Sequence, residues 1–333
     1  MSKVVVCGAG GFIGGHLTRQ LRGTGHDVRA VDVKPAGEWL QITPGADNRQ
    51  LDLRRIDDCR QAVADSGIVY NLAADMGGMG FIENNKALCM ISVLINTHLL
   101  MASLDAGVSK FFYASSACVY NAEKQNSPDV TALKEEDAYP AMPEDGYGWE
   151  KLFSERMCRH FREDFGLQTR IARYHNVYGP LGTWAGGREK APAAICRKVI
   201  DATLAGEDTI EVWGDGNQTR SFTWIDDCLK GTVAILESDI LEPLNLGSAE
   251  LVTINGLIDL VEDIAGVRLK RRYNLLAPKG VAGRNSDNGR IQSLLGWQPS
   301  TRLRHGMEIT YQWIHDEIVH GSRASGEQRL IPR

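Results

Sequence analysis

A short valine-rich strand that runs directly into a glycine-rich turn is the feature that most restricts how this chain can fold. Residues 4–7 are apolar, glycines follow at positions 8, 11 and 14, and helical periodicity begins after the second of them. In such a turn one glycine permits the sharp bend, the next lets the backbone approach a pyrophosphate, and the third lets the helix pack on the strand. The free N–H groups of the helix N-terminus attract the anion. An ordinary strand–helix turn is the alternative, but the flanking elements favour a dinucleotide site.

An acidic residue in the second predicted strand identifies the dinucleotide. Asp32 lies eighteen residues after Gly14. A carboxylate there accepts hydrogen bonds from the adenosine ribose and repels a 2′-phosphate, which favours NAD over NADP. Asp52 could contact the adenine end, although a solvated loop acid is an equally simple interpretation. The residues predicted to bind the cofactor are Gly8, Gly11, Phe12, Ile13, Gly14, Asp32 and Asp52, with Tyr147 and Lys151, which are discussed below.

Strand-like and helix-like segments alternate through the first half of the 333-residue chain. Strands are predicted at 3–7, 28–33, 48–53, 68–72, 110–115 and 168–173, and helices at 11–22, 56–64, 82–106 and 147–165. This alternation predicts an α/β fold, a Rossmann-like doubly wound parallel sheet. A smaller C-terminal α/β lobe is expected to bind substrate. We predict an NAD-binding domain at 1–174 with a return of the chain at about 225–250, a mainly substrate-binding lobe at 175–320, and a disordered tail at 321–333.

Composition excludes several classes of function. The chain is 43% hydrophobic and 24% charged, which is typical of a globular protein, and its net charge of −5 provides no basic field for nucleic acid or an anionic membrane. The longest apolar stretch, 87–104, is interrupted by polar residues, among them Ser92, Asn96, His98 and Ser103. The seven cysteines are scattered and form no CxxC pair, which indicates reduced thiols, a cytoplasmic location and no metal site.

Three side chains indicate oxidation–reduction of a hydroxyl group. Tyr147 and Lys151 stand four positions apart, so they share one face of a helix, and a nearby ammonium and a positive nicotinamide would lower the phenol pKa. Ser116 ends a predicted strand, where ligands of a doubly wound sheet bind. A surface cation beside an aromatic ring is the alternative for the pair alone. Together with the glycine turn, these residues resemble the extended short-chain dehydrogenase/reductase superfamily, in which Ser116 would orient the substrate hydroxyl and Lys151 would bind the nicotinamide ribose.

Five segments carry a more specific resemblance. They lie at 71–82, 111–120, 182–194, 213–222 and 283–288, and together they resemble the GDP-mannose 3,5-epimerase family over about residues 3–318. The resemblance implies NAD-dependent epimerisation of GDP-α-D-mannose to GDP-L-galactose and GDP-L-gulose through a transient 4-keto intermediate. Two other interpretations stay open: an epimerase or dehydratase of the same fold acting on another nucleotide sugar, and a catalytically silent nucleotide sensor. The resemblance also implies a homodimer joined through helices 82–106 and 147–165.

The family pattern assigns roles to residues that would otherwise be read as structural. Tyr147 would remove the C4 hydroxyl proton, and Cys118 and Lys190 match the acid/base pair, although a buried inert thiol and a solvated lysine are their ordinary interpretations. Arginines 220 and 284 suit a substrate diphosphate, because a guanidinium fork matches phosphate oxygens. The predicted catalytic residues are Tyr147, Lys151, Ser116, Cys118 and Lys190. The predicted substrate-binding residues are Gly77, Ser115, Asn176, Lys190, Gln218, Arg220 and Arg284.

Overall fold

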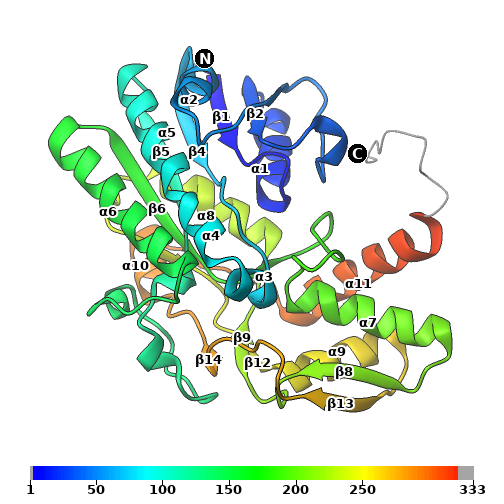
Figure 1. Ribbon diagram of the computed structural model, residues 1–333. Coiled ribbons are helices and arrows are strands. Elements are labelled where there is room, and N and C mark those ends of the chain that lie inside the picture. The colour runs from blue at the N-terminus through cyan, green and yellow to red at the C-terminus, as the bar shows by residue number, and fades with distance from the viewer. Residues whose placement is uncertain (1–2, 322–333) are drawn as a thin grey trace.

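A seven-stranded parallel sheet forms the centre of the computed structural model, which describes residues 3–321 (Figure 1). The strand order is β11-β6-β5-β4-β1-β2-β3, and every neighbouring pair is parallel. The predicted doubly wound sheet is therefore confirmed. Its strands are β1 (Lys3–Cys7), β2 (Val28–Asp32), β3 (Asp47–Gln50), β4 (Ser66–Asn71), β5 (Lys110–Ser116), β6 (Gln168–Tyr174) and β11 (Leu244–Leu246).

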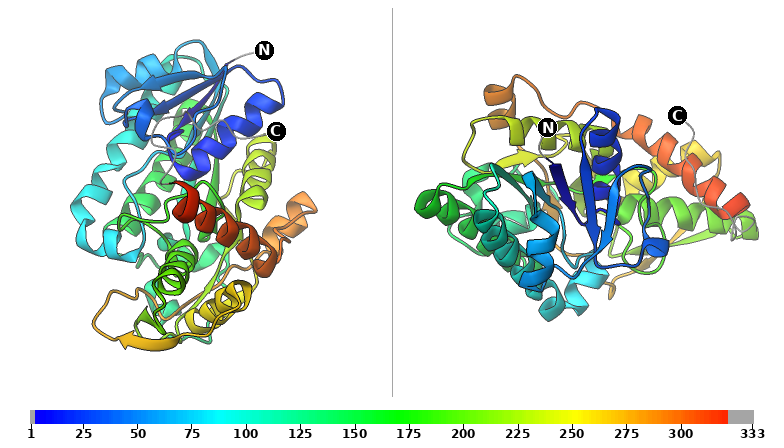
Figure 2. Two further views of the ribbon diagram at one scale, coloured as in Figure 1. Left: turned by 90° about the vertical axis from the view of Figure 1, so that its right-hand side faces the viewer. Right: turned by 90° about the horizontal axis from the view of Figure 1, so that it is seen from above.

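Helices cover both faces of this sheet (Figures 1 and 2). Alternate residues of a strand point to opposite faces, and β1 shows the consequence clearly. Val4 and Val6 belong to the apolar core under α1 and α8, whereas Val5 and Cys7 belong to a second core under α2, α5 and α6. The helices are α1 (Phe12–Gly23), α2 (Ile56–Val63), α5 (Val93–Asp105), α6 (Tyr147–Phe165) and α8 (Ile225–Glu237). Burial on both faces explains why these strands are continuous apolar runs.

The later part of the chain builds a smaller α/β layer beside the carboxyl ends of the main strands (Figure 1). Helices α7 (Ala191–Ala205), α9 (Ile254–Ala265) and α11 (Leu303–His320) pack against one another. The short strands are β7 (Val177–Tyr178), β8 (Thr209–Trp213), β9 (Thr219–Ser221), β10 (Thr223–Trp224), β12 (Leu251–Thr253), β13 (Lys270–Asn274) and β14 (Gly283–Arg284), with α10 (Gly289–Leu295) beside β11. Both α8 and β11 return to the main sheet. The division into domains stays a prediction, and the tail predicted at 321–333 lies outside the described residues beyond position 321.

The single helix predicted at 82–106 is wrong, because this segment is divided into three helices. They are α3 (Met79–Asn84), α4 (Lys86–Ile91) and α5. Asn85 leaves the helical region, with φ −132° and ψ 42°, and its side-chain amide donates to the Phe81 carbonyl at 2.9 Å. Ser92 separates α4 from α5 although it keeps helical dihedral angles, φ −58° and ψ −16°. Its hydroxyl accepts a bond from the Asp75 N–H of another segment at 3.0 Å. The bond of the Asn85 amide to a nearby backbone carbonyl competes with the regular helix, and periodicity alone did not reveal this competition.

Within residues 3–321, the stretch Lys86–Asp105 is long and apolar enough to cross a membrane, judged by length and composition only. Less than half of that stretch, 44%, is buried inside the protein. Its buried side packs on α2 and α6. The opposite side leaves several large apolar side chains exposed, among them Met90, Ile91, Leu94 and Met101.

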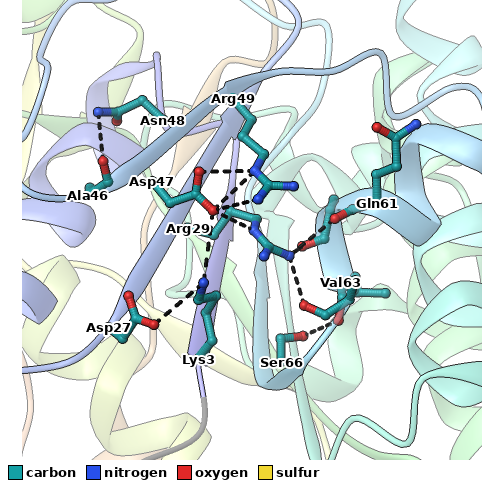
Figure 3. Close-up of polar contacts among 12 residues, drawn as sticks. Lys3, Asp27, Arg29, Ala46, Asp47, Asn48, Arg49, Gln61, Val63 and Ser66 are labelled. Atoms are coloured by element: carbon teal, nitrogen blue, oxygen red, sulfur yellow. Dashed lines mark hydrogen bonds and ion pairs between the residues drawn. The ribbon is translucent and has the colours of Figure 1, made fainter.

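A buried arginine ties the edge of the sheet together (Figure 3). Arg29 of β2 is only 4% exposed, and its Nε donates to Asp47 Oδ2 of β3 at 3.0 Å. Its Nη1 donates to the carbonyls of Gln61, Ala62 and Ala64 at 3.1, 2.8 and 2.8 Å. These carbonyls lie at the end of α2, where helices leave acceptors unsatisfied and the dipole favours a cation. One guanidinium therefore joins two strands and a helix terminus.

We expect Arg29→Met to lower the free energy of unfolding by about 3–5 kcal/mol, because it leaves a carboxylate and three carbonyls without their shared donor. Arg49→Met is the matched control, since Arg49 pairs with the same Asp47 at 2.9 Å but is 38% exposed. That change should cost about 0–1 kcal/mol. Urea unfolding followed by circular dichroism measures both, and equal losses would contradict the role given to Arg29.

Candidate active site

The candidate site is assembled where the main strands end and the smaller layer begins. Parallel strands bring their carboxyl ends to one edge of the sheet, so residues far apart in sequence meet there. The end of β1 supplies the glycine turn, and the end of β5 supplies Ser116 and Cys118. Tyr147 begins α6, and Lys190 immediately precedes α7. The predicted catalytic residues therefore all lie on this edge.

The glycine turn forms a cradle that side chains would fill. Gly8 has φ +81°, in the left-handed region that favours glycine, and a Cβ on it would lie 3.0 Å from the Ala73 nitrogen. A Cβ on Gly14 would lie 2.2 Å from the Gly8 carbonyl oxygen. Gly11 precedes α1 and provides no side-chain cap, so the first N–H groups of the helix are free for an anion. Phe12 and Ile13 open the helix, and the whole turn fits a pyrophosphate.

Asp32 lies directly beside this turn. Its Oδ2 accepts the Gly10 N–H at 3.0 Å, and its Oδ1 accepts the Lys34 N–H at 3.0 Å. A Cβ on Gly10 would lie 2.8 Å from the Trp39 ring. Sequence reasoning missed Lys34 and Trp39, and the only available signal was a cation and an aromatic residue soon after the second strand. Asp52 follows β3 and pairs with the neighbouring arginine 54, so its contact with a cofactor stays a prediction.

The structure groups Tyr147, Lys151 and Ser116, the residues predicted for oxidation–reduction. The Ser116 hydroxyl lies beside the Tyr147 phenol, and the Lys151 ammonium lies 5.5 Å from the centre of the Tyr147 ring. Burial raises the pKa of Tyr147 well above its ordinary value, Cys118 and Glu150 add to the rise, and Ser116 opposes it. The expected lowering of this pKa is therefore not produced by the surrounding side chains. It would have to come from the positive nicotinamide ring.

A buried acid behind Lys151 was not predicted. The Glu150 carboxylate lies 3.6 Å from the Lys151 ammonium and accepts the hydroxyls of Tyr113 and Ser154 at 3.0 and 3.1 Å. The Lys151 side chain is itself buried. Burial of an ammonium without a counter-ion is costly, so the Glu150 carboxylate stabilises Lys151 in this position. The available signal was the glutamate directly before the lysine in the sequence.

Cys118 sits on a short 3₁₀ turn after β5. Its N–H donates to Ser116 Oγ at 3.2 Å, and Arg284 Nη1 donates to its sulfur at 3.6 Å. Burial raises its pKa to about 11, with Glu144 adding to the rise and Arg284 opposing it. Gly148 in the first turn of α6 makes room for this segment, because a Cβ there would lie 2.3 Å from the Cys118 carbonyl oxygen. This contact explains a glycine that helix propensity alone disfavours.

Lys190 immediately precedes α7, on a loop that is fastened to the glycine-rich segment. The Gly78 N–H donates to the Arg188 carbonyl at 3.0 Å, and a Cβ on Gly78 would lie 2.4 Å from the Glu189 carbonyl oxygen. Gly77 therefore lies next to the Lys190 loop. Burial lowers the pKa of Lys190, and Cys118 opposes this by electrostatic interaction. The structure thus brings the predicted pair within electrostatic reach of each other.

The two arginines proposed for the diphosphate have different surroundings. Arg284 is committed to protein partners, because it donates to Gln125 Oε1 at 2.7 Å and also bonds to Glu144 and Cys118. It therefore lies at Cys118, one member of the predicted acid/base pair. Arg220 donates to three backbone carbonyls, at 2.7, 3.0 and 2.7 Å, and has no ion pair with a carboxylate among residues 3–321. Burial lowers its pKa to about 10, with the charge of Arg284 adding to the effect. Arg220 is the better candidate for an anionic ligand.

Two further substrate candidates lie in the smaller layer or at its border. The Gln218 amide donates to the Trp213 carbonyl at 2.8 Å, and its buried Oε1 has no protein partner in the described part of the chain. Asn176 follows β6 with φ +37°, and its amide donates to the Ser221 carbonyl at 3.2 Å. Both stay predictions as substrate contacts.

Ser115 is not brought into this group. Adjacent residues of a strand point to opposite faces, so Ser115 points away from the side occupied by Ser116. Its hydroxyl donates to Glu155 Oε1 at 2.5 Å, and that carboxylate pairs with Arg173 at 2.7 Å. His175 is also structural, as its Nε2 bonds to Asn245 at 2.9 Å and burial lowers its pKa to about 3.

Known proteins resemble this chain over most of its length. Residues 4–247 match the model of the NAD dependent epimerase/dehydratase family. The GDP-mannose 3,5-epimerase of Arabidopsis thaliana is 45% identical over 317 residues, which cover 95% of this chain and 83% of the plant protein. A dTDP-4-dehydro-6-deoxy-D-allose reductase of a Streptomyces species is 32% identical and covers 93% of this chain and 95% of that protein.

Solved structures agree with these sequence relatives. The UDP-glucuronic acid 4-epimerase of Bacillus cereus, solved with UDP-glucuronic acid and NAD, has a TM-score of 0.78 and 28% identity, and it covers 94% of this chain and 98% of that chain. The UDP-glucose 4-epimerase of Thermotoga maritima has a TM-score of 0.84 at 23% identity, covering 95% and 99% of the two chains, and supports the fold alone. The extent of identity to the plant enzymes shows that this protein belongs to the NAD-dependent epimerase/dehydratase family, in the branch of the GDP-mannose 3,5-epimerases.

Proposed function

We propose that this protein is an NAD-dependent epimerase that converts GDP-α-D-mannose into GDP-L-galactose, and into GDP-L-gulose when C5 alone is inverted. The observation that carries the proposal is the presence of two proton-handling side chains, Cys118 and Lys190, beside the Tyr147–Lys151 centre. A simple dehydrogenase needs only the latter centre. Identity of 45% to the GDP-mannose 3,5-epimerases of Arabidopsis thaliana and Oryza sativa supports this choice of substrate.

The first half of the reaction uses the oxidation–reduction centre. The glycine cradle and Asp32 would hold NAD, which supplies a reversible hydride acceptor when bound. Tyr147 takes the proton of the C4 hydroxyl, and Ser116, whose own hydroxyl lies beside the phenol, orients the substrate hydroxyl. Lys151, buried beside Glu150, provides positive charge near the phenol. The product of this half is a 4-keto sugar.

The second half moves protons at carbon. A 4-ketone acidifies the hydrogens on C3 and C5, and inversion requires that a proton leaves one face and another arrives on the opposite face. Cys118 carries a proton near neutral pH because its pKa is raised to about 11. Burial lowers the pKa of Lys190 and so increases the fraction of neutral amine. The two groups therefore form a donor and an acceptor.

We further propose a homodimer joined through α4, α5 and α6, and a cytoplasmic location for a chain whose seven cysteines are free and buried. Exposed apolar residues support the dimer. Leu94 and Met101 lie seven positions apart on α5, and Trp149 and Phe153 lie four positions apart on α6, so each pair forms a stripe. These helices gather on one side of the molecule (Figure 1). A second copy would cover both stripes.

Incubation with GDP-mannose in deuterated water tests the catalytic proposal. We expect deuterium at C5 and C3 in NMR spectra, with new L-galactose and L-gulose signals. Deuterium at C5 alone would mean that the enzyme inverts carbon C5 and leaves C3 unchanged. No exchange by folded, NAD-loaded protein would overturn the substrate and redirect the test to other nucleotide sugars, and absence of turnover on all of them would favour a nucleotide sensor.

Cys118→Ser and Lys190→Met should each reduce this deuterium exchange by roughly 10²–10⁴-fold, the range for loss of one acid/base group. Formation of reduced cofactor, measured by absorbance at 340 nm, should persist, because Tyr147 and Lys151 are untouched. Lys198→Met is the control, since Lys198 lies on α7, directly after the Lys190 loop, but donates to the Glu211 carbonyl at 3.0 Å. Loss of both readouts in Cys118→Ser would place the thiol in the oxidation step instead.

Introduction of a charge into the exposed stripe should separate the dimer. We expect Met101→Asp to give a monomeric mass by light scattering at micromolar concentration, because an unpaired carboxylate in an apolar interface is strongly disfavoured. Leu204→Asp serves as the control, as Leu204 is exposed on α7 away from the stripes. A monomeric wild-type protein would contradict the dimer.

A further inference from the structure

One guanidinium connects the reactive thiol to a buried acid that has no assigned role. Arg284 Nη1 donates to the sulfur of Cys118 at 3.6 Å, and its Nη2 bonds to Oε1 of Glu144. Its Nε is occupied by Gln125 at 2.7 Å, so the plane of the group is fixed. The three segments involved are far apart in the chain, because Arg284 lies 140 residues from Glu144 and 166 from Cys118. The contact is therefore a product of the tertiary fold.

Glu144 is built into the site. Its N–H donates to the Cys118 carbonyl at 3.0 Å, which anchors its backbone beside the thiol turn. Its side chain is only 10% exposed, and its Oε2 is buried without a hydrogen-bond partner among the described residues. A buried carboxylate with one unsatisfied oxygen is costly, and such groups concentrate at functional sites. The ion pair with Arg284 uses Oε1 of Glu144, so it does not account for the buried Oε2.

We propose that Glu144 is a positioning residue for the proton chemistry of this site: through Arg284 it keeps the proton shared by Cys118 and Lys190 on the sulfur before substrate reacts. Arg284 alone would stabilise a thiolate by direct contact. The Glu144 carboxylate neutralises that guanidinium and repels a second negative charge next to it. The proposal deepens the proposed function, because it specifies how the same pair is set before catalysis.

Other charges around Cys118 do not replace this effect. Arg220 and Arg284 are the cations of the arginine cluster, Lys190 faces the thiol from the start of α7, and Tyr147 faces it from α6. The two guanidinium groups, and Lys190 whenever it is protonated, favour the thiolate, and Glu144 is the anion that opposes them. Burial acts in the same direction as Glu144 and raises the pKa of Cys118.

Protons are conserved in an inversion that starts with Cys118 protonated and Lys190 neutral. In an inversion that starts here, the C–H bond of the keto sugar breaks, its electrons form an enolate, and its proton goes to the neutral amine of Lys190. The S–H bond of Cys118 then breaks as its proton forms the new C–H bond on the other face. This leaves a thiolate paired with Arg284 and an ammonium on Lys190. Transfer of one proton from the ammonium to the thiolate, through solvent, restores the starting state.

The test is the titration of the thiol itself, which needs no substrate. Thiolate absorbance at 240 nm is measured against pH for each protein and for its Cys118→Ser counterpart, and the difference isolates Cys118 from the six other cysteines. We expect Glu144→Gln to lower the half-titration point by about 1–3 pH units, because a like charge has been removed. Glu144→Asp should stay near wild type, as should the control Glu136→Gln, which alters an exposed acid of the neighbouring segment.

A second variant has the opposite sign. Arg284→Gln removes the contact cation and should raise the half-titration point, so the inference stays testable if Glu144→Gln does not fold. A Glu144→Gln protein with wild-type titration, or with a higher midpoint, would overturn the proposal. If the titrations shift as expected while GDP-mannose is not turned over, the proposed substrate fails and the role of Glu144 stands.

Discussion

The close approach of helix α1 to the end of strand β1 is the constraint on which the rest of the site depends. The helix can begin where it does only because position 14 has no Cβ, which would lie 2.2 Å from the Gly8 carbonyl oxygen. That contact sets α1 on the sheet and leaves its first N–H groups free. The parallel register then places the ends of β4 and β5 beside this turn. Cofactor site and reactive side chains share one edge as a result.

Burial is the second constraint, and it explains most of the unusual chemistry. Several charged groups are removed from water and paired with a group of opposite charge, although Arg220 has no carboxylate partner among residues 3–321. Lys151 has Glu150, Arg284 has Glu144, and Arg173 has Glu155. The first two pairs lie at reacting groups, whereas the third supports the sheet from behind. All three are buried ion pairs of the same chemical type. Their roles differ because only the first two lie at the edge of the sheet where the candidate site is formed.

Local sequence patterns predicted what is local in the structure. The glycine turn, the alternation of strands and helices, and Tyr147 with Lys151 all follow from spacing within a few residues. The division of helix 82–106 did not, because the break at Asn85 depends on a hydrogen bond between its side chain and the backbone. The placement of Ser115 could have been inferred, since adjacent strand residues cannot face the same side. Glu144 could not, because it lies in an irregular segment and meets Arg284 across 140 residues.

Gly148 has a consequence for how the two halves of the chemistry are coupled. The first turn of α6 carries the phenol, and the same turn rests against the carbonyl of the cysteine segment with no room for a methyl group. The segment bearing the thiol and the helix bearing the phenol are therefore one rigid unit. A change in the position of one of these two segments must therefore be accompanied by a change in the other. The separation of phenol and thiol is limited by contact between two stretches of backbone, and not by side-chain packing alone.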